Sequence, residues 1–390
     1  MALTKLEKCK MLGINEAIRA SKYDIPINPS LLISLLSFWS LVTNTFSFPK
    51  GYMTPTLADV FALMCLRPMG AFTHNLMAVG KGPEEDILNV IPLNYDNFIK
   101  EVKGSDNSPI IYKEECCFYL FWICKFLACI SSKRVINYFL PIARCLVNGT
   151  PIDLSSFVLG ELHRAMFLLN TEPKQSHGGH VWLMQMWAYS YFPSIAPELH
   201  HTIVPWLYGE AWMHAKYLEE VPSYPTWFRL FSYSSRKRSP KDFMPFEAKM
   251  YGSKDFQKFS NQGFFRGDSA WGACLYLRDL VVIRATNTGI KAYCPSLVAR
   301  QFGLVQLLPV PLTWTKNKDW DSTVSIFKDE AQKVSTLARE RVTNFAFTPF
   351  QVRPLSSSSF HSWWETYMAR FNNEDDLIEA IQGFCPLFLL

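Results

Sequence analysis

The sequence predicts a mainly α-helical protein, an irregular multi-helix domain with a few short β-hairpins. Three stretches of the chain, 57–64, 154–169 and 321–341, carry apolar residues at helical spacing. A fourth stretch, 43–55, instead joins β-branched and aromatic residues to a Pro-Lys-Gly turn, which is typical of a hairpin. Hydrophobic residues make up 49% of the chain and charged residues 19%, so a folded core is expected.

The chain, at 390 residues, exceeds the size at which a single core usually keeps growing. We therefore expect one extended domain over 1–390, built from two interlocked halves, 1–170 and 171–390. The net charge of +5 is too weak to argue for nucleic-acid binding, which the composition leaves open. Ten cysteines without a Cys-x-x-Cys pair indicate buried, reduced thiols. The first residues lack a signal-peptide core, and serines or a lysine interrupt the apolar runs 31–42 and 116–130, so no membrane partner is expected.

Helices are expected on both sides of the hairpin, each from its own apolar stripe and end signals. Thr56 is placed to cap the helix after the hairpin, whose first turn carries Asp59. Gly149 is positioned to end a helix, because glycine readily takes the left-handed conformation there. A strand is expected near Leu280. The expected helices cover 5–20, 28–39, 57–64, 113–148 as a pair, 154–169, 181–191, 321–341 and 374–381.

The stretch from Trp39 to Gly70 holds a Trp, then N-T-F-x-F-P-x-G, then M-T-P-T-L-x-D-V. This order resembles the plant mobile domain, the family of the plant meristem-maintenance proteins, which also carries the label aminotransferase-like. Tyr52 and Ala58 depart from the family, which usually has Glu at both positions. The residues that carry this first pattern are Trp39, Phe46, Phe48, Gly51, Thr54, Thr56, Leu57 and Asp59.

Two further patterns carry the same resemblance. One reads G-x-x-W-L-x-Q-x-W-A-Y-x-x-F-P and runs from Gly179 to Pro193. The other begins at Tyr293, reads Y-x-P and then V-A-R-Q-F-G, and has Leu297 where the family usually has Arg. With the first pattern they follow the family order over nearly the whole chain. The residues concerned are Trp182, Gln185, Trp187, Arg300, Gln301, Phe302, Gly303 and Gln306.

The resemblance implies a non-enzymatic domain that acts in the nucleus through protein–protein interaction. The family is linked to transposable-element silencing, gene expression control and genome stability, and its partners include a phosphatase-like protein; no cofactor is implied. Aromatic residues make up 15% of the chain, and we expect them to supply the docking face. A basic run is either a nuclear-import patch or a solvated loop, and comprises Arg236, Lys237, Arg238 and Lys241.

The aminotransferase-like label finds no support in the residues. No Lys stands in the context of a pyridoxal phosphate site, and the metal-binding motifs of metallophosphoesterases are absent from the sequence. Two histidine pairs offer too few ligands for a usual zinc site, whereas His163 and His214 lie among apolar helical residues and are expected in the core. The paired histidines are His177 with His180 and His200 with His201.

Two rival hypotheses stand beside the interaction domain. The chain is alternatively a transposon-derived protein with DNA-acting or enzymatic activity, for which Asp59, Asp153 and Asp268 are the candidate carboxylates. The second hypothesis is that the chain is a decayed copy of such a protein without a cellular role. No spacing of the carboxylates favours either hypothesis over an interaction domain.

Overall fold

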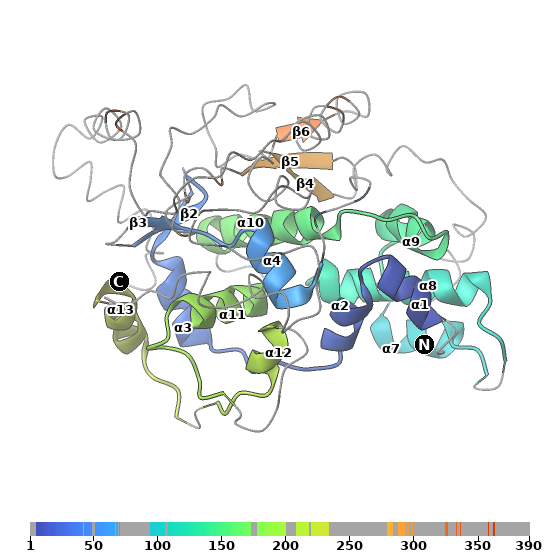
Figure 1. Ribbon diagram of the computed structural model, residues 1–390, viewed down its shortest axis with the longest axis horizontal. Coiled ribbons are helices and arrows are strands. Elements are labelled where there is room, and N and C mark those ends of the chain that lie inside the picture. Colours follow the sequence, from blue (N-terminus) through green and yellow to red (C-terminus); the bar gives the residue numbers. More distant parts are fainter. Residues whose placement is uncertain are drawn as a thin grey trace, which may run out of the picture.

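The protein is mainly helical and carries two small antiparallel sheets, as the sequence predicts (Figure 1). The computed structural model describes residues 5–41, 43–48, 51–66, 94–105, 108–172, 178–199, 208–217, 220–233, 279–283, 288–293 and 324–326, with single positions at 68, 70, 295, 298, 301, 333, 336, 358 and 362. The tail helix expected over 374–381 lies outside these residues.

The helices of the described residues follow one another along most of the first 233 positions. A π-helix, η2 (Ile123–Leu127), continues α8, and a short 3-10 helix, η3 (Asn137–Phe139), leads into α9. The α-helices are α1 (Leu6–Met11), α2 (Asn15–Ala20), α3 (Pro29–Leu36), α4 (Leu57–Met64), α7 (Tyr95–Val102), α8 (Tyr112–Trp122), α9 (Leu140–Val147), α10 (Leu154–Thr171), α11 (Val181–Tyr191), α12 (Tyr208–Met213) and α13 (Tyr224–Tyr233).

The expected hairpin is confirmed as part of a three-stranded sheet. Strand β2 (Thr45–Phe48) pairs with β3 (Gly51–Met53), and Phe48 lies opposite Gly51. A third strand, β1 (Trp39–Ser40), pairs with the other edge of β2. The second helix was expected to run to about Trp39, but α3 ends at Leu36, because the indole of Trp39 packs from a strand onto the ring of Phe46.

A second sheet, β4 (Asp279–Ile283), β5 (Thr288–Ala292) and β6 (Val324–Ile326), confirms the strand expected near Leu280. The same sheet shows that the helix expected over 321–341 was wrong at its start, since Val324 lies opposite Ile290 in an antiparallel ladder. The Val-Ser-Ile triplet of β6 alternates apolar and polar residues, and pairing with β5 overrides the helical period. Lys333 and Thr336, later in this stretch, are helical.

The core is centred on α10 and α11. Helix α10 packs against β4 on one side and α4 on another, and α11 packs against α3 and α4 (Figure 1). Helix α11 was expected to be central because it is aromatic on nearly all sides, and its residues from Leu183 to Tyr191 are all buried. Helix α13 covers α3 at the periphery.

The helix expected over 5–20 is broken into α1 and α2. Gly13 adopts a φ of 68°, the N–H of Gly13 donates to the carbonyl of Lys10 at 3.0 Å, and the N–H of Ile14 donates to that of Cys9 at 3.0 Å. This pair of bonds is the Schellman arrangement that ends a helix. The same arrangement at Gly149, with a φ of 75°, confirms the helix end predicted there.

Candidate functional site: a buried polar node around Asp59

The first pattern folds into a reciprocal cap at the start of α4. The N–H of Thr56 donates to Oδ2 of Asp59 at 2.8 Å, and the N–H of Asp59 approaches Oγ1 of Thr56 at 3.4 Å. The hydroxyl of Thr56 also donates to Oδ2 of Asp59 at 2.6 Å. Both side chains are buried. The cap predicted at Thr56 is confirmed, and Asp59 completes it by satisfying an N–H that precedes the helix.

The segments that hold the other two patterns reach the same carboxylate, through an unspecified position of the second pattern and the Gln of the third. The hydroxyl of Tyr191, at the end of α11, donates to Oδ1 of Asp59 at 2.8 Å. Nε2 of Gln301 lies 3.5 Å from Oδ2 of Asp59, and Oε1 of Gln301 accepts from the N–H of Thr54 at 3.0 Å. The N–H of Leu57 donates to the hydroxyl of Tyr293 at 3.3 Å. The three patterns therefore meet at one point, the Asp59 node, formed by Thr54, Thr56, Leu57, Asp59, Tyr191, Tyr293 and Gln301.

The charge state of Asp59 follows from its burial. Removal from water raises the pKa of this carboxyl to about 6, although the hydrogen bonds from Thr56 and Tyr191 act in the opposite direction. The carboxylate is only 4% exposed, and its oxygens already accept from three side chains and one backbone N–H. Such a group is placed to join segments of the chain, and a substrate could reach it only by breaking these bonds.

The aromatic residues of the patterns form one buried layer beside the node. The ring of Phe46 stacks on Trp187 with centroids 5.2 Å apart, and Trp39 meets Phe46 edge-on at 5.0 Å. Phe48 contacts Phe192 at 5.0 Å. The rings of Trp39, Phe46 and Trp187 are fully buried, so they contribute core packing and no surface.

Gln185 fastens the chain that leads into α3. Its Oε1 accepts from the N–H of Asn28 at 2.8 Å, and its Nε2 donates to the carbonyl of Pro26 at 2.8 Å. Gly179, which opens the second pattern, has a φ of +123°, and an added Cβ would overlap the side chain of Ala165 on α10. Trp182 is partly buried and packs against the core. These residues position α11 on its neighbours.

The two residues that depart from the first family pattern, Tyr52 and Ala58, lie in a strand and a helix of the fold. Ala58 is 2% exposed on α4, so a glutamate there would enter the core, where an apolar residue is suited. Tyr52 lies in β3 opposite Ser47, and Gly51 pairs with Phe48. The structure does not describe the remaining pattern residues or the basic run: Arg300, Phe302, Gly303, Gln306, Arg236, Lys237, Arg238 and Lys241.

The candidate carboxylates do not act as a set in the described residues. Asp153 caps α10, because its Oδ1 accepts from the N–H of Ser156 at 2.9 Å, and burial raises the pKa of its carboxyl to about 6. At α4 the cap is Thr56, and Asp59 in the first turn accepts from the N–H of that cap. Asp268 lies outside the described residues. Each described carboxylate therefore bonds at the N-terminus of its own helix.

Of the singled-out histidines that the structure describes, two are buried and one is partly exposed. Burial lowers the pKa of His180 to about 4, and its Nε2 lies 3.0 Å from the carbonyl of Phe126. Burial and the nearby charge of Lys291 lower the pKa of His163 to about 3. His214 pairs with Glu210 at 3.4 Å and is partly exposed. The structure does not describe His177, His200 or His201.

Across the described ranges, no three His, Cys, Asp or Glu side chains gather as a metal site would require. Within the same ranges, no helix combines the length and apolar character needed to cross a bilayer.

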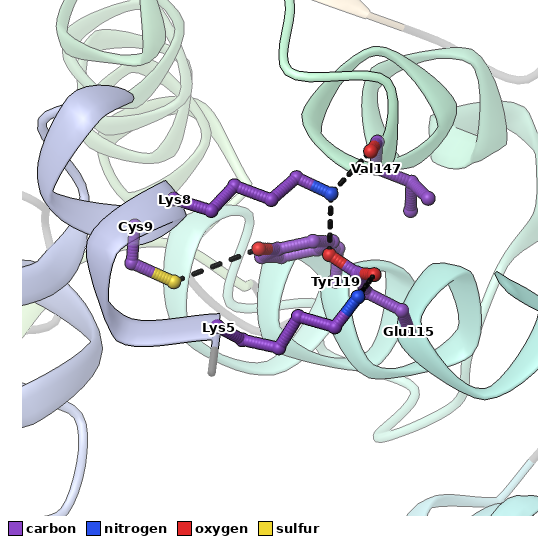
Figure 2. Close-up of polar contacts among 6 residues, drawn as sticks. All are labelled: Lys5, Lys8, Cys9, Glu115, Tyr119 and Val147. Atoms are coloured by element: carbon purple, nitrogen blue, oxygen red, sulfur yellow. Dashed lines mark hydrogen bonds and ion pairs between the residues drawn. The ribbon is translucent and has the colours of Figure 1, made fainter. Parts of the chain in front are cut away.

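Two buried charged groups were missed by sequence reasoning. Glu115 on α8 is 3% exposed and binds the ammonium groups of Lys5 and Lys8, each at 2.6 Å (Figure 2). Burial alone would raise the pKa of Glu115, but hydrogen bonds and charge from the two lysines outweigh it and lower the pKa. Lys291 on β5 is buried with its ammonium 4.1 Å from the ring centroid of Phe167. No local pattern could have paired residues more than 100 positions apart.

Among curated proteins and solved structures, none matches this chain. A family model described as the plant mobile domain matches residues 13–365, which contain all three patterns and the whole Asp59 node. The chain therefore belongs to the plant mobile domain family.

Proposed function

We propose that this chain is a non-enzymatic interaction domain of the meristem-maintenance kind, acting in the nucleus in transposable-element silencing, gene expression control and genome stability. The observation that carries the proposal is the use made of the pattern residues. Asp59, Gln185 and Gln301 have their polar atoms bonded to other parts of the chain, and Phe46 and Trp187 are enclosed in the core. Residues used in this way hold a frame together and leave its surface free to bind a partner.

The proposed docking face is narrower than the aromatic content suggested. Most large aromatic side chains in the described residues lie inside, but Tyr233 is 81% exposed and Phe228 is 37% exposed on α13. Phe228 is held in place by stacking on Phe38, with centroids 4.9 Å apart. We call Phe228 and Tyr233 the α13 face. Rigid aromatic groups on a helix surface are typical anchors of protein interfaces.

The proposal is tested by comparing co-precipitation from plant nuclei for two surface variants. We expect the double variant Phe228→Ser, Tyr233→Ser to lose a partner protein that the wild type recovers, with a phosphatase-like protein as the first candidate. The matched control is Tyr112→Ser, which removes a 45% exposed aromatic residue from α8 and should leave recovery unchanged. Equal recovery by all three proteins, or no partner for the wild type, would count against the interaction domain.

The enzymatic alternative makes a different prediction for the carboxylates. An active centre would lose its activity on Asp59→Asn or Asp153→Asn while the fold stayed intact. If these carboxylates only cap helices, each variant should change stability and nothing else. A decayed copy would have neither a partner nor an activity. Measuring expression of the gene in plant tissue tests this alternative, because a decayed copy needs no expression.

A further inference from the structure

The break between α1 and α2 falls at Gly13, a residue that can either end a helix or continue one. Leu12, Ile14, Ala17 and Ile18 are the apolar residues from which a single helix over 5–20 is predicted. The chain bends because Gly13 takes a φ of 68°, which places α1 back against the body of the domain. Two conformations of the same segment, bent or straight, thus differ mainly at one glycine.

Helix α1 is fixed by contacts on α8 and α9. The ammonium groups of Lys5 and Lys8 share the buried carboxylate of Glu115, and Lys8 also donates to the carbonyl of Val147 at the end of α9 (Figure 2). The thiol of Cys9 lies 3.6 Å from the hydroxyl of Tyr119. A helix of six residues has little stability of its own, so these contacts keep it folded. We call Glu115, Tyr119 and Val147 the α1 seat.

We propose that α1 exchanges between two copies of this chain, with Gly13 as the hinge. When Gly13 becomes helical, residues 5–20 form one helix about 24 Å long, which carries α1 away from its own seat. The emptied seat of each copy is then occupied by α1 of the other copy, because the lysine pair of α1 already matches the seat. Each exchanged α1 makes the same contacts as before, so the two-fold dimer gains a continuous helix and loses no ion pair.

The backbone hydrogen bonds of the bent and the straight form favour the exchange. In the bent form the N–H groups of Gly13 and Ile14 bond to Lys10 and Cys9. In a straight helix they would instead bond to Cys9 and Lys10 respectively, four residues back. Both donors are therefore bonded in either form, and the straight helix additionally offers partners four residues back to the N–H groups of Asn15, Glu16 and Ala17 at the start of α2. The equilibrium depends on the conformational preference of residue 13, on the contacts between α1 and α2 that the straight form gives up, and on the concentration of the chain.

The first experiment changes that preference. Gly13→Ala disfavours the positive φ of the bent form and favours the helix, and should shift the opening equilibrium of each chain by about 5- to 30-fold toward the straight form. The matched control is Gly13→Asn, since Asn tolerates the left-handed conformation and should stay close to wild type. Size-exclusion chromatography with light scattering, over a range of concentrations, should detect a dimer that increases in Gly13→Ala. A strictly monomeric Gly13→Ala with wild-type helical content would overturn the proposal.

A cross-linking experiment tests whether the dimer arises by exchange at the seat. Equal amounts of nitrogen-14 and nitrogen-15 labelled Gly13→Ala are refolded together and treated with a carbodiimide, which joins an ammonium to a carboxylate. In the dimer fraction about half of the peptides joining Lys8 to Glu115 should carry mixed labels, because equal amounts of the two chains pair at random. The monomer should give unmixed labels alone. Unmixed labels in the dimer would overturn the proposal, because the two copies would then associate through another surface.

Mixing two complementary variants keeps the proposal testable if substitutions at the seat destabilise the chain. Lys5→Gln, Lys8→Gln has an intact seat but a poor α1, and Glu115→Gln has an intact α1 but a poor seat. In the Gly13→Ala background each alone should dimerise less than Gly13→Ala, and refolding the two together should restore a heterodimer with one complete seat. Dimerisation indifferent to these changes would also contradict the exchange.

Discussion

Replacement of Asp59 by asparagine is the sharpest test of the node, because it removes the charge and nearly preserves the shape. The carboxyl of Asp59 is buried, and its pKa is raised from 3.8 to about 6. A raised pKa means that the folded state binds the proton more tightly than the unfolded state. The carboxyl therefore stabilises the fold below about pH 4, and this contribution is lost as the pH rises through 6. A shift of this size corresponds to about 3 kcal/mol.

Asp59→Asn should abolish this pH dependence. The amide oxygen can accept from Thr56, and the hydroxyl of Tyr191 can rotate to accept from the amide nitrogen. The wild type should lose about 2–3 kcal/mol of unfolding free energy between pH 4 and pH 7 that the variant keeps. Urea unfolding followed by tryptophan fluorescence at both pH values measures this difference. Other titrating groups, including His163 and His180, are common to both proteins and cancel.

A second variant separates loss of charge from loss of bonds. Asp59→Ala leaves the donors of Thr56, Tyr191 and Gln301 without their acceptor, and should be about 2–4 kcal/mol less stable than Asp59→Asn at every pH, since neither variant titrates at this position. If Asp59→Asn is as unstable as Asp59→Ala, and the difference of each from wild type does not change with pH, the buried carboxyl does not act in this way.

Three further predictions concern the surroundings of the node. Burial lowers the pKa of His163 to about 3, so the folded state resists its protonation. His163→Phe should keep about 2 kcal/mol of unfolding free energy that the wild type loses between pH 7 and pH 5. Equal losses for the two proteins in urea unfolding would contradict this. Gly179→Ala should lower the free energy of unfolding by more than about 2 kcal/mol, because its Cβ would overlap Ala165. Gly149→Ala, whose Cβ would meet only Met11 at 3.8 Å, should cost about 1 kcal/mol, and equal losses for the two variants in urea unfolding would contradict the overlap at Gly179. Gln185→Leu should cost about 2–4 kcal/mol, because Asn28 and Pro26 lose their partners, and a neutral result in thermal melts would rule out that role.

Local signals in the sequence predicted the elements whose ends they mark. Thr56 with Asp59 began α4, Gly149 ended α9, and the run of aromatic residues identified α11 as central. The same reasoning missed the end of α1, although Gly13 after Lys8 and Lys10 is a helix-end signal of the same kind. The apolar stripe was given more weight than the glycine.

Contacts between distant segments were beyond local reasoning. Strand β6 exists because β5 offers a partner, and periodicity contains no information about that partner. The three patterns were recognised in order, but nothing in their spacing placed Tyr191 and Gln301 on one carboxylate. Glu115 and Lys8 are 107 positions apart and carry no motif. Such pairings depend on the packing of whole helices.

We propose that the pattern residues build the frame of a binding domain, and this role is tested by the recovery of a partner with Asp59→Asn from plant nuclei, normalised to the amount of folded protein. We expect the same partner at the wild-type level, since the variant keeps the frame and α13 is unchanged. A variant that folds like the wild type but loses its partner, or an activity, would place Asp59 in a working site and contradict the claim.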